Sequence, residues 1–207
     1  MPFLVAALIA AGCGSSSSGG TGGGGPSTSA AATGGSAATT SGGGSGALSA
    51  EANSAATGDI PDNQVFLVFT NHPAGYSMKY PEGWTQSGAG PSVTFNDKNN
   101  RVRVLIASEP APTPASLTRE LQALKAATPS LTYQPPHTVQ LPAGPAVTTT
   151  YTTLSAPNSV TGKRVLLIVK RYEIAKGGQR ATVDLGTPQG VDNKDAYKLI
   201  INSFHWR

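Results

Sequence analysis

The sequence contains little charge and one cysteine. Charged residues make up 13% of its 207 residues, aromatic residues make up 6%, and Cys13 is the only cysteine. An intramolecular disulfide is therefore excluded, and the fold depends on a hydrophobic core. No apolar run approaches the roughly 20 residues that a membrane-spanning helix needs. No compact run of Lys or Arg is present, so we expect no nucleic-acid partner.

Several motifs of catalysis and cofactor binding are also absent. The chain has no Gly-x-Ser-x-Gly elbow, no His-Glu-x-x-His, no phosphate-binding glycine loop before a helix and no EF-hand loop. None of the three histidines, His72, His137 and His205, lies within four residues of another. We therefore expect no metal site, no cofactor and no catalytic residues, although a catalytic triad is spatial and can escape a sequence search.

Cys13 stands at the end of a short apolar segment. The run from Phe3 to Gly12 is too short to span a membrane, and Ala11 and Gly12 provide small residues directly before the cysteine. This pattern predicts a lipoprotein signal peptide at residues 1–12, cleavage before Cys13, and a lipid on the Cys13 thiol. The alternative is an ordinary signal peptide with an incidental cysteine. The expected location is the cell envelope, outside the cytoplasm and anchored to the membrane.

The composition then changes twice along the chain. Residues 14–50 are almost wholly Gly, Ser, Ala and Thr and contain no charged residue. Such a segment cannot bury enough apolar surface to offset its ordering entropy, so residues 13–63 are expected to form a disordered tether. The segment 64–207 is the expected folded domain. It holds all 15 basic residues and 8 of the 11 acidic ones, which gives it a net charge of +7 and favours an anionic partner.

Apolar periodicity predicts an α+β domain. Strands are expected at 65–69, 76–80, 93–95, 101–108, 137–141, 146–154, 164–174 and 180–185. The strand at 164–174 is apolar on both faces in its middle, which is typical of a central, covered strand. The order of elements indicates an antiparallel sheet with helices packed on it.

Two helices are expected beside these strands. The first is capped by Thr113 or Ser116, and its apolar stripe is Leu117, Leu121 and Leu124. The second is capped by Asp192, and its stripe is Ala196, Leu199, Ile200 and Phe204.

Two groups of side chains have both a structural and a functional interpretation. Tyr76, Tyr80 and Trp84 either pack in the core or line a ligand pocket, and packing is favoured. A second group either faces a groove for an acidic ligand or forms a solvated strand end, and the latter is favoured; its members are Lys163, Arg164, Lys170 and Arg171.

The segment Gly75-Tyr76-Ser77-Met78-Lys79-Tyr80-Pro81-Glu82-Gly83-Trp84 resembles the opening motif of the PsbP-like family. Two later segments are also similar to sequences of that family: the end of a strand at Val93–Asp97 and the end of the last helix at Ile200–Phe204. The resemblance covers about residues 65–207. It implies an α-β-α sandwich around a central antiparallel sheet. The family includes photosystem II extrinsic subunits, a Ran-binding nuclear transport factor and bacterial lipoproteins, and the chain is most similar to the mycobacterial LpqN and LpqT group of these.

The resemblance implies a binding or assembly module for an envelope protein or small ligand, not an enzyme. No partner-contacting motif of the photosystem or Ran-binding members can be matched in this chain. Two alternatives stay open: a tethered envelope hydrolase with a nonstandard site, and a structural wall-spacing protein. The expected contacts are the membrane, through the lipid, and an envelope protein or anionic ligand.

Overall fold

The computed structural model describes residues 58–158 and 160–207, all within the unit Ser41–Arg207 of the chain. The predicted signal peptide, Cys13 and most of the predicted tether lie outside these described residues. The strands are β1 (Phe66–Asn71), β2 (Tyr76–Pro81), β3 (Thr85–Ala89), β4 (Ser92–Asp97), β5 (Asn100–Ala107), β6 (His137–Leu141), β7 (Gly144–Leu154), β8 (Leu166–Lys176), β9 (Gln179–Pro188) and β10 (His205–Trp206). The helices are α2 (Pro114–Ala127) and α3 (Lys194–Ser203).

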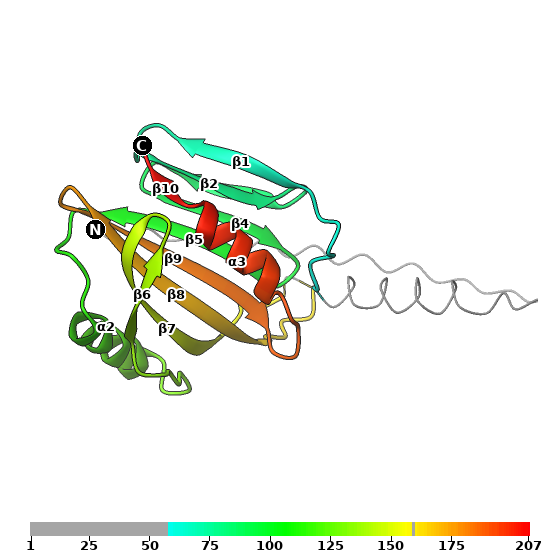
Figure 1. Cartoon of the computed structure of the whole chain (residues 1–207). Helices are drawn as coiled ribbons and strands as arrows, with labels where there is room; N and C mark the ends of the chain where they lie inside the picture. The colour runs from blue at the N-terminus through cyan, green and yellow to red at the C-terminus, as the bar shows by residue number, and fades with distance from the viewer. Residues whose placement is uncertain (1–57, 159) are drawn as a thin grey trace, which may run out of the picture. The chain divides into compact units, whose positions relative to one another are not determined.

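Seven strands form one antiparallel sheet in the order β3-β4-β5-β9-β8-β7-β6, and β1-β2-β10 form a second, smaller sheet. The two helices lie on opposite faces of the large sheet (Figure 1). On one face, α2 packs with Leu117 and Leu121 against Val147 and Val169. On the other face, α3 and the small sheet cover β4, β5 and β9. The predicted α-β-α arrangement around an antiparallel sheet is confirmed.

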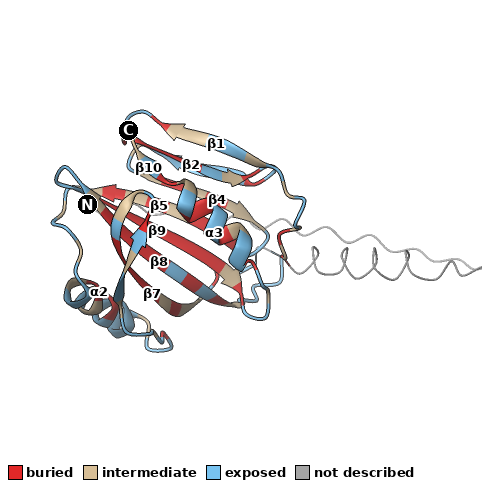
Figure 2. Cartoon of the chain, in the orientation of Figure 1, coloured by how far each residue is buried: buried red, intermediate tan, exposed pale blue. Residues whose placement is uncertain are grey.

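The burial of β5 alternates strictly, as expected for a strand with one core face. Val102, Val104 and Ile106 are buried on the α3 side, and the residues between them are partly exposed (Figure 2). The turn Lys98-Asn99 joins β4 to β5, and Lys98 adopts a left-handed conformation with φ of 52°. The predicted hairpin at 93–108 is therefore confirmed. The preceding edge strand β3 was not predicted, because its sequence, TQSGA, is polar and lacks a buried face.

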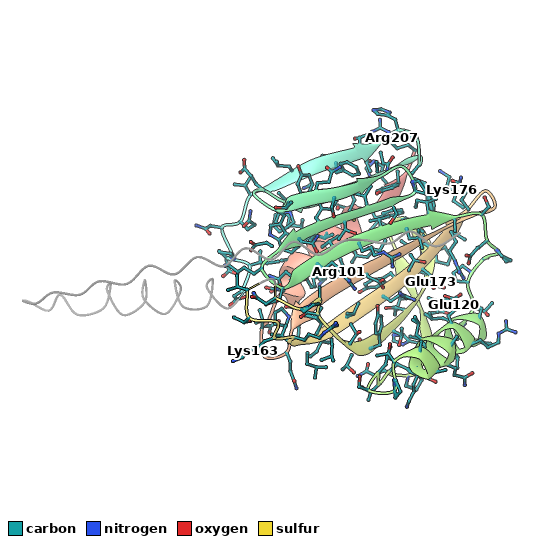
Figure 3. All side chains as sticks on the ribbon, turned by 180° about the vertical axis from the view of Figure 1, so that it is seen from behind. Arg101, Glu120, Lys163, Glu173, Lys176 and Arg207 are labelled. Atoms are coloured by element: carbon teal, nitrogen blue, oxygen red, sulfur yellow. The ribbon has the colours of Figure 1, made fainter. Side chains whose placement is uncertain are left out.

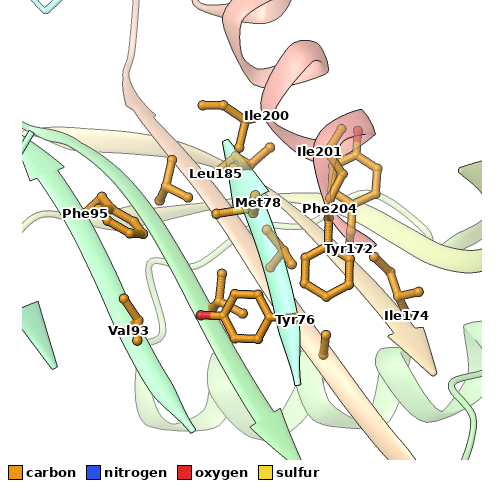
Figure 4. Close-up of a cluster of buried hydrophobic side chains, with 14 of the residues drawn as sticks. Tyr76, Met78, Val93, Phe95, Tyr172, Ile174, Leu185, Ile200, Ile201 and Phe204 are labelled. Carbon is orange, nitrogen blue, oxygen red and sulfur yellow. The ribbon is translucent and has the colours of Figure 1, made fainter. Parts of the chain in front are cut away.

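Aromatic residues join the small sheet to the large one. The Tyr80 ring stacks on Phe95 with 4.3 Å between centroids, and Tyr76 stacks on Phe204 at 5.5 Å. Figure 4 shows Tyr76, Phe95 and Phe204 in one cluster with side chains of β8, β9 and α3. Trp84 belongs to the same core and is 8% exposed, which confirms the prediction that it is largely buried. Aromatic pairs of this kind contribute beyond the area that they bury.

Helix α2 begins with a capping box. The Thr113 hydroxyl accepts from the Ser116 backbone at 3.0 Å, and the Ser116 hydroxyl accepts from the Thr113 backbone at 2.9 Å. Pro114 occupies the first turn, where its missing N–H has no helical partner to lose. The predicted cap and the burial of Leu117 and Leu121 are confirmed. Leu124 was wrongly placed in the buried stripe: it is exposed, because the cluster that receives the other two leucines does not extend to the last turn.

Helix α3 begins one residue later than predicted. Asn193, not Asp192, occupies the N-cap position, and its side chain makes no cap hydrogen bond. The Asn193 amide instead donates to Asn100 at 3.0 Å and to Thr187 at 2.9 Å, and its oxygen accepts from the Ile60 backbone at 2.8 Å. Tertiary contacts therefore override its local role. Gly58 and Ile60 pack on the fold through these contacts, ahead of residue 64, where the sequence placed the beginning of the domain.

The buried face of α3 also differs from the prediction. It consists of Tyr197, Ile200 and Ile201, followed by Phe204, whereas Leu199 is exposed and Ala196 is only partly buried. The helix is rotated relative to the predicted stripe because Tyr197 is anchored in the sheet: its hydroxyl donates to the Gly186 carbonyl at 2.6 Å. Ile200 and Ile201 then lie over the core.

Candidate functional site

A groove lies between α3 and the sheet face formed by β6, β7, β8 and β9. Its cavity volume is about 780 Å³. Apolar side chains from the strands and the helix line it, among them Leu141, Ile168, Leu185 and Ile201. This volume is within the range of pockets that hold small organic ligands.

Side chains alternate between the two faces of a strand, and this alternation determines which residues of β8 line the groove. On β8, Ile168, Lys170 and Tyr172 alternate with residues that face α2, so these three share the groove face. Ile168 is 36% exposed although it lies in the interior of a strand. No protein element of the described chain covers this side chain, so the floor of the groove is open, apolar surface. Exposed apolar floors with polar rims are typical of ligand sites.

Cations stand at the polar rim of the groove. The Lys170 ammonium lies 5.4 Å from the centre of the Tyr172 ring, and Lys198 of α3 lines the same cavity. Within the described chain, neither lysine forms a salt bridge with a carboxylate. Lys194, by contrast, lies 3.0 Å from Asp192, and its hydrogen bonds lower the pKa of that carboxyl group. Lys170 and Lys198 are therefore the groove cations available to an anionic ligand.

A second cavity of about 530 Å³ lies on the side of α3 that faces the small sheet. It is lined by Val68 and Leu199, two exposed apolar side chains, and by Lys79. Asn202 lines both cavities, so this second cavity adjoins the groove.

The structure separates the basic residues that the sequence grouped together. Lys170 faces the groove, which supports the interpretation that was not favoured for it. Arg171 faces the opposite side of the sheet and donates two hydrogen bonds to Asp184, at 2.7 and 2.9 Å. Lys163 and Arg164 precede β8 in a loop, where Arg164 donates to the Ser155 carbonyl at 3.2 Å. Only one of the four therefore belongs to the groove.

The apolar character of both faces of β8 explains why the sequence did not reveal the groove. The run Val165–Val169 is apolar on both faces, which predicts cover on both sides. In the structure, α2 covers Leu167 and Val169 on one face of β8. On the other face, Ile168 lines the groove instead of being covered by a second helix. Its remaining walls come from β6 and α3, which the sequence could not place beside β8.

Tyr76, Tyr80 and Trp84 line neither cavity, and all three pack in or against the core. The favoured structural interpretation of these aromatic residues is confirmed.

The three histidines lie in different parts of the structure. His137 lines the groove, His72 lies in the turn between β1 and β2, and the His205 ring is 2.7 Å from the Ser77 hydroxyl. The other ring nitrogen of His205 lies 3.1 Å from the Ser203 carbonyl. Among the described residues, no group of His, Cys, Asp or Glu is arranged to hold a metal ion, and no helix is long and apolar enough to cross a membrane.

A buried cluster of charges lies beneath α2. Arg180 contacts three carboxylates, those of Glu109, Glu120 and Glu173, the last at 3.3 Å. Glu173 is fully buried, and one of its oxygens accepts no hydrogen bond in the described structure. Burial raises the pKa of Glu173 to about 8, and the charge of Glu120 acts in the same direction. Burial therefore favours the protonated form of this carboxyl group.

Comparisons with known proteins find similar structures but no matching family model and no matching curated protein. The chain is similar to cyanobacterial PsbP (CyanoP) from Synechocystis, with 20% identity, a TM-score of 0.48 and coverage of 72% of this chain and 98% of that one. The similarity is one of fold. It agrees with the PsbP-like resemblance of the sequence.

Two further structures share this similarity. A protein of Bacteroides thetaiotaomicron is 16% identical, with a TM-score of 0.43 and coverage of 68% of this chain and 48% of that one. The Saccharomyces cerevisiae Ran-binding protein Mog1p is 7% identical, with a TM-score of 0.47 and coverage of 70% and 96%.

Proposed function

We propose that this chain is a non-enzymatic binding module of the cell envelope, held at the membrane by a lipid on Cys13, and that its groove binds an amphipathic small molecule. The observation that carries this proposal is the 780 Å³ groove, whose apolar floor is uncovered and whose rim holds Lys170 and Lys198. Ile168 is exposed in the middle of a sheet, and exposed apolar surface with a polar rim is typical of an interaction site.

The lining defines the chemistry of the ligand. The floor provides apolar contact through Ile168, Leu185 and Ile201, which favours a hydrocarbon body. The two unpaired ammonium groups favour an anionic head, because a charge-assisted hydrogen bond is about twice as strong as a neutral one. The adjoining cavity beside Leu199 provides room for a longer apolar tail. An aliphatic carboxylate, sulfate or phosphate has this combination.

The proposed location follows from the sequence. The apolar run before Cys13 and the small residues Ala11 and Gly12 support lipid attachment. The Gly/Ser-rich segment after Cys13 supports a flexible connection between the lipid and the domain.

The binding proposal is tested with dodecanoate below its micellar concentration, measured by calorimetry. Ile168→Glu places a carboxylate on the floor and should weaken binding by more than tenfold. Lys170→Gln should weaken dodecanoate binding several-fold while leaving binding of the uncharged dodecyl maltoside unchanged. Lys163→Gln, outside the groove, is the matched control and should behave as the parent protein. Saturable binding that survives Ile168→Glu would place the ligand elsewhere.

One observation favours a hydrolase instead. The Ser77 hydroxyl and the His205 ring are at hydrogen-bonding distance, and Ser203 orients that ring, as in a nucleophile–base pair. However, Ser77 is 0% exposed and lines neither cavity, so a substrate carbonyl cannot reach its oxygen without movement of β10. We therefore assign this pair the role of attaching β10 to β2. Turnover of a generic ester that Ser77→Ala abolishes would support the hydrolase.

A further inference from the structure

The sheet face opposite the groove is only partly covered. Helix α2 packs over the β7 and β8 end of this face. Towards β5 and β4, no helix of the described residues lies over the sheet, and Figure 3 shows Arg101 there, away from α2. Arg103 shares this face with Arg101, because the two are separated by one residue on β5, and its side chain is 34% exposed.

Two guanidinium groups of this face, those of Arg103 and Arg171, contact the Asp184 carboxylate. Arg171 donates to both oxygens of Asp184, at 2.7 and 2.9 Å, and Arg103 lies 3.6 Å from one of them. Arg171 also donates to the Tyr151 hydroxyl at 3.4 Å, and its guanidinium lies over the Tyr151 ring at 5.2 Å. Asp184 and Arg171 are buried, so this pair forms a rigid base beneath the exposed Arg103.

Arg101 approaches the same group across a glycine. The strand register places Arg101, Gly186, Val169 and Tyr151 in one row across β5, β9, β8 and β7. Gly186 has no side chain to separate Arg101 from the others. Burial and the Asp184 charge raise the pKa of Tyr151, whereas the charges of Arg171 and Arg101 lower it.

The charges of this group do not balance. Arg101, Arg103 and Arg171 carry three positive charges, and Asp184 supplies one negative charge. Of the nearby carboxyl groups, Glu109 and Glu120 contact Arg180. Glu173 lies between Arg180 and Arg171, and its burial favours the neutral form. In addition, the Arg101 Nε is buried and has no acceptor within the described part of the chain. Buried or partly buried charges are normally paired, so two positive charges remain for an external anion.

We propose that Arg101 and Arg103 form a binding site for the phosphate group of a small, hydroxylated molecule in solution. Two unbalanced guanidinium groups match the charge and the oxygen geometry of a phosphate dianion. Across β4, Asn96 stands opposite Arg101 and Thr94 opposite Arg103, on the same face and partly exposed. Their side chains can hydrogen-bond to hydroxyl groups of the molecule that carries the phosphate. The site is separate from the groove and does not rest on the proposed function.

The position of α2 favours a soluble ligand over a lipid headgroup. The helix stands on the same face as Arg101 (Figure 3), and a helix with its side chains is about 10 Å thick. A flat bilayer that approaches this face therefore meets α2 before it reaches the sheet, whereas a small molecule reaches it freely.

The test uses the full chain and calorimetric titration with glucose 1-phosphate and with inorganic phosphate at low ionic strength. The double variant Arg101→Gln/Arg103→Gln should weaken glucose 1-phosphate binding at least about tenfold. Arg101→Lys keeps the charge but loses the planar donor fork, so it should weaken binding by less. The control Lys163→Gln/Lys176→Gln removes the same net charge from exposed positions outside the site and should bind as the parent protein. Unchanged melting temperatures establish that each variant is folded.

Three results would overturn the proposal. The first is the absence of saturable binding of either phosphate compound to the parent protein. The second is an equal loss of binding in the control variant, which would indicate an effect of net charge alone. The third is binding to phosphatidylglycerol vesicles that the Arg101/Arg103 double variant loses, without binding of glucose 1-phosphate, which would assign the site to a membrane headgroup.

Discussion

Lys170 and Arg171 are neighbours on β8 whose side chains point to opposite faces of the sheet and lie in different surroundings. Lys170 lies in the groove beside Tyr172, without a carboxylate partner in the described structure, whereas Arg171 is buried and holds Asp184 with two hydrogen bonds. A substitution of Lys170 should therefore affect a ligand, and a substitution of Arg171 should affect the fold. Removing one partner of a buried ion pair leaves the other charge uncompensated.

This difference gives the first prediction. Arg171→Gln should lower the free energy of unfolding by about 3–5 kcal/mol, because Asp184 then remains buried without its bidentate partner. Lys170→Gln should change it by less than about 0.5 kcal/mol, as expected for an exposed side chain. Urea unfolding of the two variants checks the contrast. Equal effects would mean that the two side chains are not in different environments.

Glu173 predicts an unusual dependence of stability on pH. Its pKa in the folded protein is about 8, well above the ordinary value, so the folded state holds a proton that the unfolded state has lost. Stability from this group is present at low pH and is lost as the pH rises from about 5 to 8. Glu173→Gln should remove that part of the dependence, because the amide of Gln does not titrate. Unfolding curves at pH 5, 6.5 and 8 measure it; the same slope in both proteins contradicts the prediction.

Trp84 closes the core between the two sheets. Trp84→Ala should lower the free energy of unfolding by about 3–5 kcal/mol, because the substitution leaves a large cavity among packed side chains. Chemical denaturation followed by circular dichroism provides the measurement. Leu199→Ala, at an exposed position of α3, is a suitable comparison and should cost much less. A loss below about 1 kcal/mol at Trp84 would place the ring at the surface.

The contacts of Gly58 and Ile60 predict where the chain can be shortened. Removing residues 1–57 should leave the melting temperature within a few degrees of the parent. Removing residues 1–63 should cost about 2–4 kcal/mol, because it exposes the core around Ile60 and removes the hydrogen bonds of Gly58 and Ile60 with Asn100 and Asn193. Melting of the two truncated proteins distinguishes these contributions. Equal midpoints would show that residues 58–63 do not stabilise the fold.

Cys13 predicts where the protein is found. Replacing Cys13 with Ala should release the protein from the membrane fraction, because the variant lacks the thiol that we propose to carry the lipid. Immunoblots of membrane and soluble fractions from cells that produce each form provide the test. If both forms partition alike, the protein is not held by a lipid on this residue.

Local patterns were enough to predict much of the fold. The alternation in β5 and the capping signals before α2 depend on adjacent residues, and both were predicted correctly. The exact start of α3 was not, because Asn193 is held by residues far away in sequence, Ile60 and Asn100. Polar contacts between distant residues leave no periodic signal.

The candidate sites likewise combine features that adjacent residues reveal with features that depend on residues distant in sequence. The apolar run of β8 was visible, but the sequence could not show that one of its faces has no cover. The shared use of Asp184 by Arg103 and Arg171 depends on the pairing of β5 with β9 and of β9 with β8, which the strands themselves do not specify.

The junction at Asn193 has a mechanical consequence. The same side chain binds Ile60 at the start of the packed chain and Asn100 on β5, and it also lines the groove. A pull on the chain ahead of Gly58 is therefore transmitted by hydrogen bonds to Asn193, at one end of the groove, and to Asn100 of β5. Tension along the chain would strain the groove lining at Asn193.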